Sequence, residues 1–338
     1  MAKRRENMKK SGWLVWTVAC ILLAASFIVS GGTASAAYPE RPITLLVGFA
    51  PGGSLDLSAR ALAASAEKIL GQPVVVENKT GGTGAVALAA LLSQQPDGYT
   101  LCATPSSVLI RVSQMQQVPF KPLKSFKSII GYTAPQLGIA VKSDAPWKTL
   151  KDLVNDAKKN PGKIKYATTG VGSTTHAAVE EIAVRAKVQM IHIPYKGSNE
   201  AMTALLGGHV EFASLTSEFV PAVKAGQLRL LATMGEERSP TFTQVPTMKE
   251  AGYDFVTDAV YGIVAPAELP ADLAKKLEKA FTQAIKDKQY LETISKMDLV
   301  LVYYSGKDFE KFMKVNWGVI NRHLVGAGLI KEAATQPE

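Results

Sequence analysis

The sequence predicts an α/β protein with two doubly wound sheets, one in each of two domains. From residue 43 onward, short apolar runs rich in β-forming residues alternate with segments of helical spacing, and glycine-rich corners join them. The same alternation starts again in the middle of the chain. A length of 338 residues with 47% hydrophobic content is sufficient for two domains, each with a buried core.

The first domain begins with a strand at residues 43–49, a Pro-Gly-Gly corner and a helix at 56–70. A buried strand follows at 73–78, then an Ala/Leu-rich helix at 84–94 and a third strand at 99–104. Strands separated by helices of this length indicate right-handed crossovers and therefore a parallel sheet.

The second domain repeats the pattern, and the chain then returns to the first. Its expected elements are strands at 137–142, 163–169, 190–195 and 210–215, with helices at 149–160, 175–186 and 199–208. After a strand at 261–266, the closing helices at 269–288 and 306–328 lack a strand set of their own. We therefore expect one lobe from residues 37–139 plus 262–338 and a second from 140–261. Two crossings between lobes suit closure around a ligand.

The N-terminus predicts export. A basic segment at residues 1–10 precedes an apolar run from Trp13 to Val29, and small residues follow the run. Ala34-Ser35-Ala36 fits the pattern that signal peptidase requires, so we expect residues 1–36 to be a cleaved signal peptide and the mature chain to be periplasmic. The alternative is an uncleaved anchor, although the run is slightly shorter than the about 20 residues of a full span.

Charge and cysteine content argue against several classes of function. The formal net charge is +9, of which residues 3–10 carry +4, and this leaves +5 for the rest. The basic residues are spread along expected helices rather than clustered with aromatic ones, so we expect no nucleic acid partner. Cys102 is the one cysteine after residue 36, which excludes an intramolecular disulfide there. Its apolar neighbours indicate a packed strand residue.

The corner after the first strand is a candidate ligand site. In a doubly wound sheet, ligands bind beyond the carboxyl ends of the strands, where the next helices begin. Gly52 and Gly53 allow close approach of the backbone, and N–H groups of the first helical turn attract an anion. Ser54 adds a hydroxyl donor. Asp56 either favours the helix N-terminus or orients a polar ligand group, and the first role is the commoner one.

A second corner, TTGVGSTTH at residues 168–176, repeats this arrangement in the other domain. Gly170 and Gly172 open the backbone, and His176 either packs structurally or donates from a neutral imidazole to a carboxylate. Two such corners, one in each domain, can hold the two ends of a small dicarboxylate. The hydroxyl groups offered here belong to Ser173, Thr174 and Thr175.

A third glycine-rich segment contains Gly82-x-Gly84-x-x-Ala87, a variant of the dinucleotide fingerprint. A true fingerprint is followed about 20 residues later by an acidic residue that holds the ribose. Here the next strand ends in CATPSS, so a glycine loop beside a cleft is the better interpretation, with a nicotinamide-dependent enzyme as the alternative. Thr104, Ser106 and Ser107 at the end of that strand are expected to face the cleft or to cap a helix.

Signals of catalysis are absent from the sequence. There is no Gly-x-Ser-x-Gly, no His-Glu-x-x-His and no Cys/His grouping suited to a metal. The four histidines, 176, 192, 209 and 323, are dispersed. We therefore expect a binding protein with no enzyme activity, no cofactor and no metal site.

Six stretches, in order over most of residues 37–338, also match a known family. They are YPERPITLLVGFAPGGSLDLSAR, GQPVVVENKTGGTGAVALAALLSQQPDGYTL, IPYKGSNEAMTALLGGHVEF, AGQLRLLAT, VPTMKEAGYDF and YGIVAPAELP. In these stretches the chain resembles the Bug-type solute receptors of the tripartite tricarboxylate transporters. The resemblance implies a two-lobed periplasmic binding protein fold of type II-like, Venus flytrap form. It also implies capture of a small carboxylate, a di- or tricarboxylate or an aromatic acid, and delivery to a membrane permease.

The resemblance further implies which residues hold the ligand. The two family loops match Ala50–Asp56 and Thr169–His176, where main-chain groups and ordered water make much of the contact. The remaining lining matches Thr104 to Ser107, together with Thr216 and Ser217. We expect a monomer, and the alternative to a permease partner is a membrane sensor kinase.

Two departures from the family pattern leave the identity of the carboxylate open. The second loop has Val171-Gly172-Ser173 where consecutive glycines are usual, and Asn78-Lys79-Thr80 replaces a more usual Asn-Arg-Pro.

Overall fold

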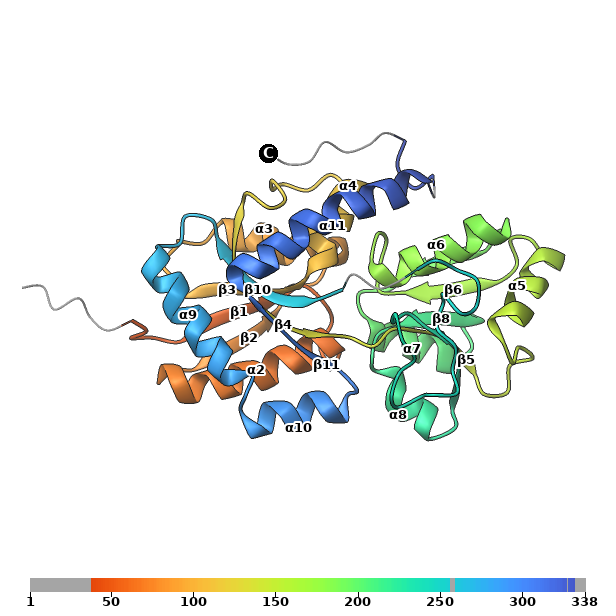
Figure 1. Ribbon diagram of the computed structural model, residues 1–338, viewed down its shortest axis with the longest axis horizontal. Helices are drawn as coiled ribbons and strands as arrows, with labels where there is room; N and C mark the ends of the chain where they lie inside the picture. The colour runs from red at the N-terminus through yellow and green to blue at the C-terminus, as the bar shows by residue number, and fades with distance from the viewer. Residues whose placement is uncertain (1–37, 256–258, 327, 332–338) are drawn as a thin grey trace, which may run out of the picture. The chain divides into compact units, whose positions relative to one another are not determined.

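The computed structural model describes residues 38–255, 259–326 and 328–331 (Figure 1). The predicted signal peptide, residues 1–36, lies outside these ranges. Within them, every helix is too short or too polar to cross a membrane. The described chain forms two mixed sheets flanked by helices, which confirms the predicted α/β class.

The first sheet has the strand order β11-β4-β10-β3-β1-β2. β1 pairs in parallel with β2 and β3, as the predicted crossovers require, whereas β4, β10 and β11 pair antiparallel. The strands are β1 (Ile43–Val47), β2 (Val74–Asn78), β3 (Thr100–Pro105), β4 (Phe126–Ala134), β10 (Tyr261–Pro266) and β11 (Val300–Ser305).

The prediction that residues 73–78 form a buried strand is wrong as to burial. β2 ends the order of the sheet and pairs with β1 alone, so it is an edge strand. Its side chains alternate in exposure, and Val75 is 52% exposed. An apolar run such as VVV therefore did not distinguish an edge strand from a central one.

Helices cover both faces of the first sheet (Figure 1). The long helix α2 buries a stripe of small apolar residues and ends at Gly71, whose left-handed backbone, with φ of 71°, terminates the helix. The closing helices pack on elements of this sheet: α9 contacts α2 and β4, and α11 contacts β4 and β11. The helices are α2 (Ser54–Leu70), α3 (Ala85–Leu92), α9 (Ala271–Ala284), α10 (Lys288–Lys296) and α11 (Gly306–Gly326).

The second sheet has the order β7-β6-β8-β5-β9, with β6 parallel to β7 and β8 and with β5 antiparallel to its partners. Because strand side chains alternate, Ile139 and Val141 join a core on one face and Ala140 joins the core on the other. The strands are β5 (Gly138–Lys142), β6 (Lys165–Thr168), β7 (Ile191–Pro194), β8 (Phe212–Leu215) and β9 (Leu228–Thr233). The helices are α5 (Leu150–Lys159), α6 (Thr174–Ala186), α7 (Ser198–Leu206) and α8 (Phe219–Lys224).

The chain passes from the first sheet to the second between β4 and β5 and returns between β9 and β10. These are the two crossings that the sequence predicts. The lobe boundaries proposed above fall within β5 and just after the first residue of β10.

Candidate functional site

A pocket lies where loops from both sheets meet. Much of its lining comes from the segments that follow β1, β3, β6 and β8, which are the strand ends that the sequence singled out, and the rest includes residues that follow β2, β4 and β7. The empty space among the lining residues is about 520 Å³, including space open to solvent.

The pocket brings together nine of the seventeen predicted site residues, from both corners. Those that line it are Ala50, Gly53, Ser54, Ser107, Thr169, Ser173, Thr174, Thr175 and Thr216. The other eight are not among the lining residues. These are Gly52, Asp56, Thr104, Ser106, Gly170, Gly172, His176 and Ser217.

The first corner begins helix α2 and is organised by Asp56. The backbone of Gly52 has φ of 80°, which favours glycine, and its N–H donates to the Asp56 carboxylate at 2.9 Å. Arg60 and the Asn78 side-chain amide also donate to this carboxylate, at 3.0 and 2.8 Å. Burial alone would raise the pKa of Asp56, but the hydrogen bonds outweigh it and the pKa lies below its ordinary value.

Asp56 is 2% exposed and is not among the residues that line the pocket, and its predicted contact with a ligand stays a prediction. Its carboxylate ties together the first loop, helix α2 and the end of strand β2. The helix-stabilising role, which the sequence favoured, is the one that its position supports.

At the end of β3, too, some of the predicted residues line the pocket and others do not. Ser107 lines the pocket, but Thr104 and Ser106 are buried and hydrogen-bonded elsewhere. The Thr104 hydroxyl donates to the Pro105 carbonyl at 3.3 Å. Ser106 donates its N–H to the Val260 carbonyl, and its hydroxyl accepts from the Val260 N–H. Ser106 therefore fixes this segment against the residue that precedes β10. The predicted ligand contacts of Thr104 and Ser106 stay predictions.

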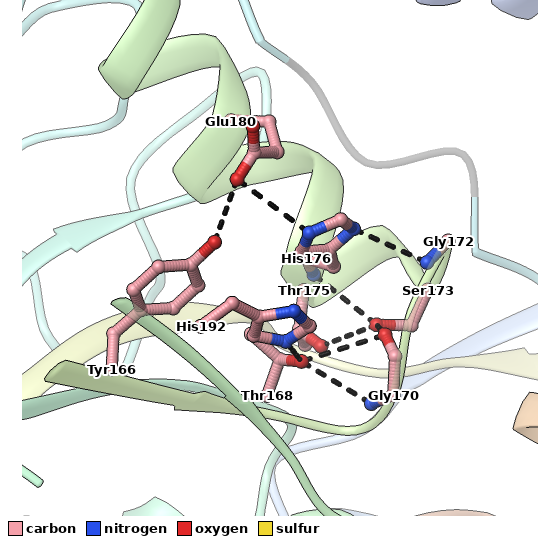
Figure 2. Close-up of polar contacts among 9 residues, drawn as sticks. All are labelled: Tyr166, Thr168, Gly170, Gly172, Ser173, Thr175, His176, Glu180 and His192. Atoms are coloured by element: carbon pink, nitrogen blue, oxygen red, sulfur yellow. Dashed lines mark hydrogen bonds and ion pairs between the residues drawn. The ribbon is translucent and has the colours of Figure 1, made fainter. Parts of the chain in front are cut away.

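The second corner is a network of hydroxyl groups at the N-terminus of α6 (Figure 2). The Ser173 hydroxyl caps the helix by accepting from the His176 N–H at 3.2 Å, and it donates to the Gly170 carbonyl at 2.7 Å. The Thr175 hydroxyl accepts from the Thr169 N–H and lies 2.9 Å from the hydroxyls of Thr169 and Ser173. The loop is thus held in one conformation by its own side chains.

His176 supports this loop from behind. Its ring stacks on the His192 ring, with centroids 4.2 Å apart, and Nδ1 accepts from the Gly172 N–H at 3.2 Å (Figure 2). Nε2 therefore carries the proton and faces the Glu180 carboxylate at 3.5 Å. Burial, and then the charge of Arg111, lowers the pKa of His176 to about 4. The ring is neutral at pH 7 and is not among the lining residues, and its predicted donation to a ligand stays a prediction.

Two polar residues that line the pocket but were not predicted from the sequence lie near the end of β8 and at the start of β10. Glu218 lines the pocket two residues after Thr216, and Tyr261 begins the strand predicted at 261–266. Ser217, which was predicted instead, accepts from the Gln136 N–H at 2.9 Å outside the lining. The sequence signal that could have identified Glu218 as a lining residue is its place in a polar segment that follows the end of a strand. The other lining residues not predicted are Phe49, Thr83, Pro135, Leu137, Gly197, Ser198 and Ala259.

The Gly82–Gly84 turn serves loop packing. A Cβ on Gly48 would lie 2.7 Å from the Gly84 Cα, so the two backbones pack directly against each other. The Thr83 hydroxyl donates to the Val171 carbonyl at 2.9 Å and so joins the first sheet to the second corner. These contacts bury Gly84, the second glycine that a pyrophosphate would need to approach, and this counts against the nicotinamide alternative.

Other chemistry finds little support in the described residues. Within them, no group of three or more His, Cys, Asp or Glu side chains is arranged to hold a metal. Cys102 is fully buried in β3, as predicted, and burial raises the pKa of its thiol. A buried, protonated thiol is not a nucleophile.

Comparisons with known proteins agree with this geometry. The family model described as "Tripartite tricarboxylate transporter family receptor" matches residues 58–323. A Cupriavidus necator protein, named "UPF0065 protein in gbd 5'region", is 41% identical over 275 residues, covering 81% of this chain and 84% of that protein. Protein BugT of Bordetella pertussis is 34% identical over 280 residues, covering 80% and 85%.

Solved structures share the fold. The periplasmic binding protein BugD superposes with a TM-score of 0.82 at 29% identity, covering 86% of this chain and 99% of that chain. A structure described as a periplasmic transporter gives 0.80 at 31% identity, covering 84% and 96%. These findings confirm both the two-lobed fold and the resemblance. The chain therefore belongs to the receptors of the tripartite tricarboxylate transporter family and is a periplasmic solute-binding protein.

Proposed function

We propose that the pocket captures a small organic carboxylate and that the protein delivers it to the membrane permease of a tripartite tricarboxylate transporter. The observation that carries this proposal is that loops of both sheets line one pocket, into which the N-terminus of α6 opens with no acidic residue in its first turn. Helix N-termini attract anions through backbone N–H groups and the helix dipole.

The pocket is built for hydrogen bonding rather than for chemistry. Its lining combines hydroxyl groups and backbone with apolar walls such as Leu55 and Leu137, and the described lining includes no lysine or arginine. Backbone and hydroxyl donors recognise a carboxylate without strong ion pairs, so a ligand can be released to a partner. This composition supports a binding protein, and we infer no enzymatic step.

The remaining features of the proposal follow from the sequence and the family. Residues 1–36 are proposed to be a cleaved signal peptide, and the two lobes to comprise residues 37–139 plus 262–338 and residues 140–261. The receptor is proposed to act as a monomer and to need no cofactor. Membrane permease subunits are the proposed partners.

Titration calorimetry of the exported protein tests this proposal. The panel contains di- and tricarboxylates, aromatic acids, a neutral sugar and an organic cation. We expect at least one carboxylate to bind with a Kd of about 1 μM or below, in line with a binding free energy of about 8 kcal/mol. Heat from the sugar or the cation, with none from any carboxylate, would refute it.

A matched pair of variants places the binding in this pocket. Thr174→Val replaces a lining hydroxyl by a methyl group, and Thr203→Val makes the same change on an exposed face of α7. Loss of one hydrogen bond to an anion is worth about 1.5 to 3 kcal/mol, so the first variant is expected to bind about 10- to 100-fold more weakly. The second is expected to bind like the wild type. Equal affinities in all three proteins would place the ligand elsewhere.

A further inference from the structure

The two helix N-termini of the pocket differ in charge. Glu218 is the one charged residue among the described residues that line the pocket, and it follows β8 of the second sheet. Its side chain is half-buried and reaches the first corner, where a Cβ on Gly53 would lie 3.4 Å from the Glu218 Oε1. A carboxylate of the protein thus lies at the start of α2, the place where an anionic ligand group would be expected.

The Glu218 carboxylate already uses the donors of this end. One oxygen accepts from the backbone N–H of Ser54, the first residue of α2, and the other accepts from the Thr216 hydroxyl. The N-terminus of α2 therefore carries two carboxylates, because Asp56 accepts from the Gly52 N–H beside it. The attraction of this helix end for an anion is offset twice by the protein's own charges.

The hydroxyl protons of this end also point toward Glu218. Each hydroxyl has one proton to donate: that of Thr216 goes to Glu218, and that of Ser54 goes to the Thr216 oxygen at 3.0 Å. The Tyr261 hydroxyl lies 2.7 Å from the Ser54 oxygen and also hydrogen-bonds the Thr216 side chain, so its proton is used within this group of hydroxyls. Burial and the charge of Glu218 both raise the pKa of Tyr261, so it keeps this proton. A ligand carboxylate placed here would meet a negative charge and few available donors.

The opposite end has no such compensation. The first turn of α6 contains no acidic residue, and the lining there consists of hydroxyl-bearing residues of the second corner. Glu180 lies one turn further along, where it accepts from the Tyr166 hydroxyl at 2.6 Å and faces His176. An anionic ligand group is therefore stabilised at α6 and repelled at Glu218.

We propose that Glu218 sets the ligand class: the receptor takes a molecule with a single carboxylate, bound at α6, and a hydrogen-bond donor such as an ammonium or amide group, bound at Glu218. Dicarboxylates of the same length are rejected because two carboxylates would face each other at the α2 end. This inference rests on the proposed function as a carboxylate receptor and narrows the class of carboxylate.

Calorimetry with matched ligands tests the inference on the exported protein. Glutarate, its monoamide and 4-aminobutanoate carry a carboxylate, an amide and an ammonium group on the same chain of methylenes. The same three end groups are tested on chains of three to six carbons and on a benzene ring. Because like charges in contact cost several kcal/mol, the wild type is expected to bind the best amide or amine about tenfold or more tightly than the matching dicarboxylate.

Glu218→Gln supplies the decisive comparison, since it keeps the size of the side chain and removes its charge. We expect this variant to lose the preference for the amine and to bind the dicarboxylate about tenfold more tightly than the wild type does. Glu236→Gln, an exposed position outside the lining, makes the same change in net charge and is expected to keep the wild-type preference.

The outcomes separate the two proposals. A wild-type protein that prefers dicarboxylates on every skeleton overturns the inference and leaves the carboxylate receptor standing, and this result does not depend on any variant. An unchanged preference in a folded Glu218→Gln variant removes Glu218 as its cause. Failure of every carboxylate in the panel to bind any of the proteins overturns the proposed function itself.

Discussion

Lowering the pH from 7.5 to 5.0 should destabilise this protein through His176. Burial holds the pKa of His176 at about 4, against an ordinary value of 6.5, so the folded protein keeps the ring neutral while the unfolded chain protonates it. Stability contributed by this neutral ring is present above pH 6.5 and is lost as the pH falls toward 4. Integrating between these pKa values gives a loss of about 2 kcal/mol at pH 5.0.

Urea denaturation, followed by circular dichroism at both pH values, measures this loss. The comparison is with His176→Gln, which can still accept from the Gly172 N–H but does not titrate. The wild type is expected to lose about 2 kcal/mol more free energy of unfolding than this variant between pH 7.5 and 5.0. His209→Gln, at an exposed position, should behave like the wild type. An equal loss in wild type and His176→Gln would refute the reasoning.

Three further changes test the support of the loops. Asp56→Asn should lower the free energy of unfolding by about 2 to 4 kcal/mol in denaturant titrations, because it removes the buried charge and puts an amide NH2 in place of one of the two oxygens that three donors share. Gly48→Ala should cost about 1 to 3 kcal/mol in thermal unfolding, because its Cβ would meet Gly84, whereas Gly326→Ala meets open space and should be neutral or slightly stabilising. Thr175→Val should weaken carboxylate binding in calorimetry about 10-fold or more by unlinking the second corner, and unchanged affinity would show that its network is dispensable.

Much of the fold could be predicted because its signals are local. Apolar runs that end in glycine corners identified β1 and β6 and placed α2 and α6 after them, and their parallel pairing followed from the crossovers. β4, β9 and β11 were not predicted. Each is identified as a strand by antiparallel pairing with a segment distant in sequence, and such pairing leaves no local pattern.

The candidate site could also be predicted only where its signals are local. The two corners could be predicted because a short stretch of sequence, such as the glycines beside Ser54, indicates the local backbone geometry and the start of a helix. The direction of a side chain is not local: His176 turns toward a ring 16 positions along the chain, and Glu218 crosses to a helix that starts 164 positions earlier. Only the folded chain shows that His176, predicted as a donor to the ligand, supports a loop. It also shows that Glu218, which was not predicted, lines the pocket.

The carboxylate of Asp56 has a consequence for the kinetics of capture. It fixes the Gly52 backbone, Arg60 and Asn78 together before any ligand arrives, so the first corner loses its conformational freedom when the protein folds. A preorganised corner does not need to become ordered on binding, and this lowers the entropic cost of each encounter. The association rate should then be limited by diffusion and by contact of the ligand with the second corner. The lifetime of the complex should depend on the rate at which the ligand dissociates from that second corner.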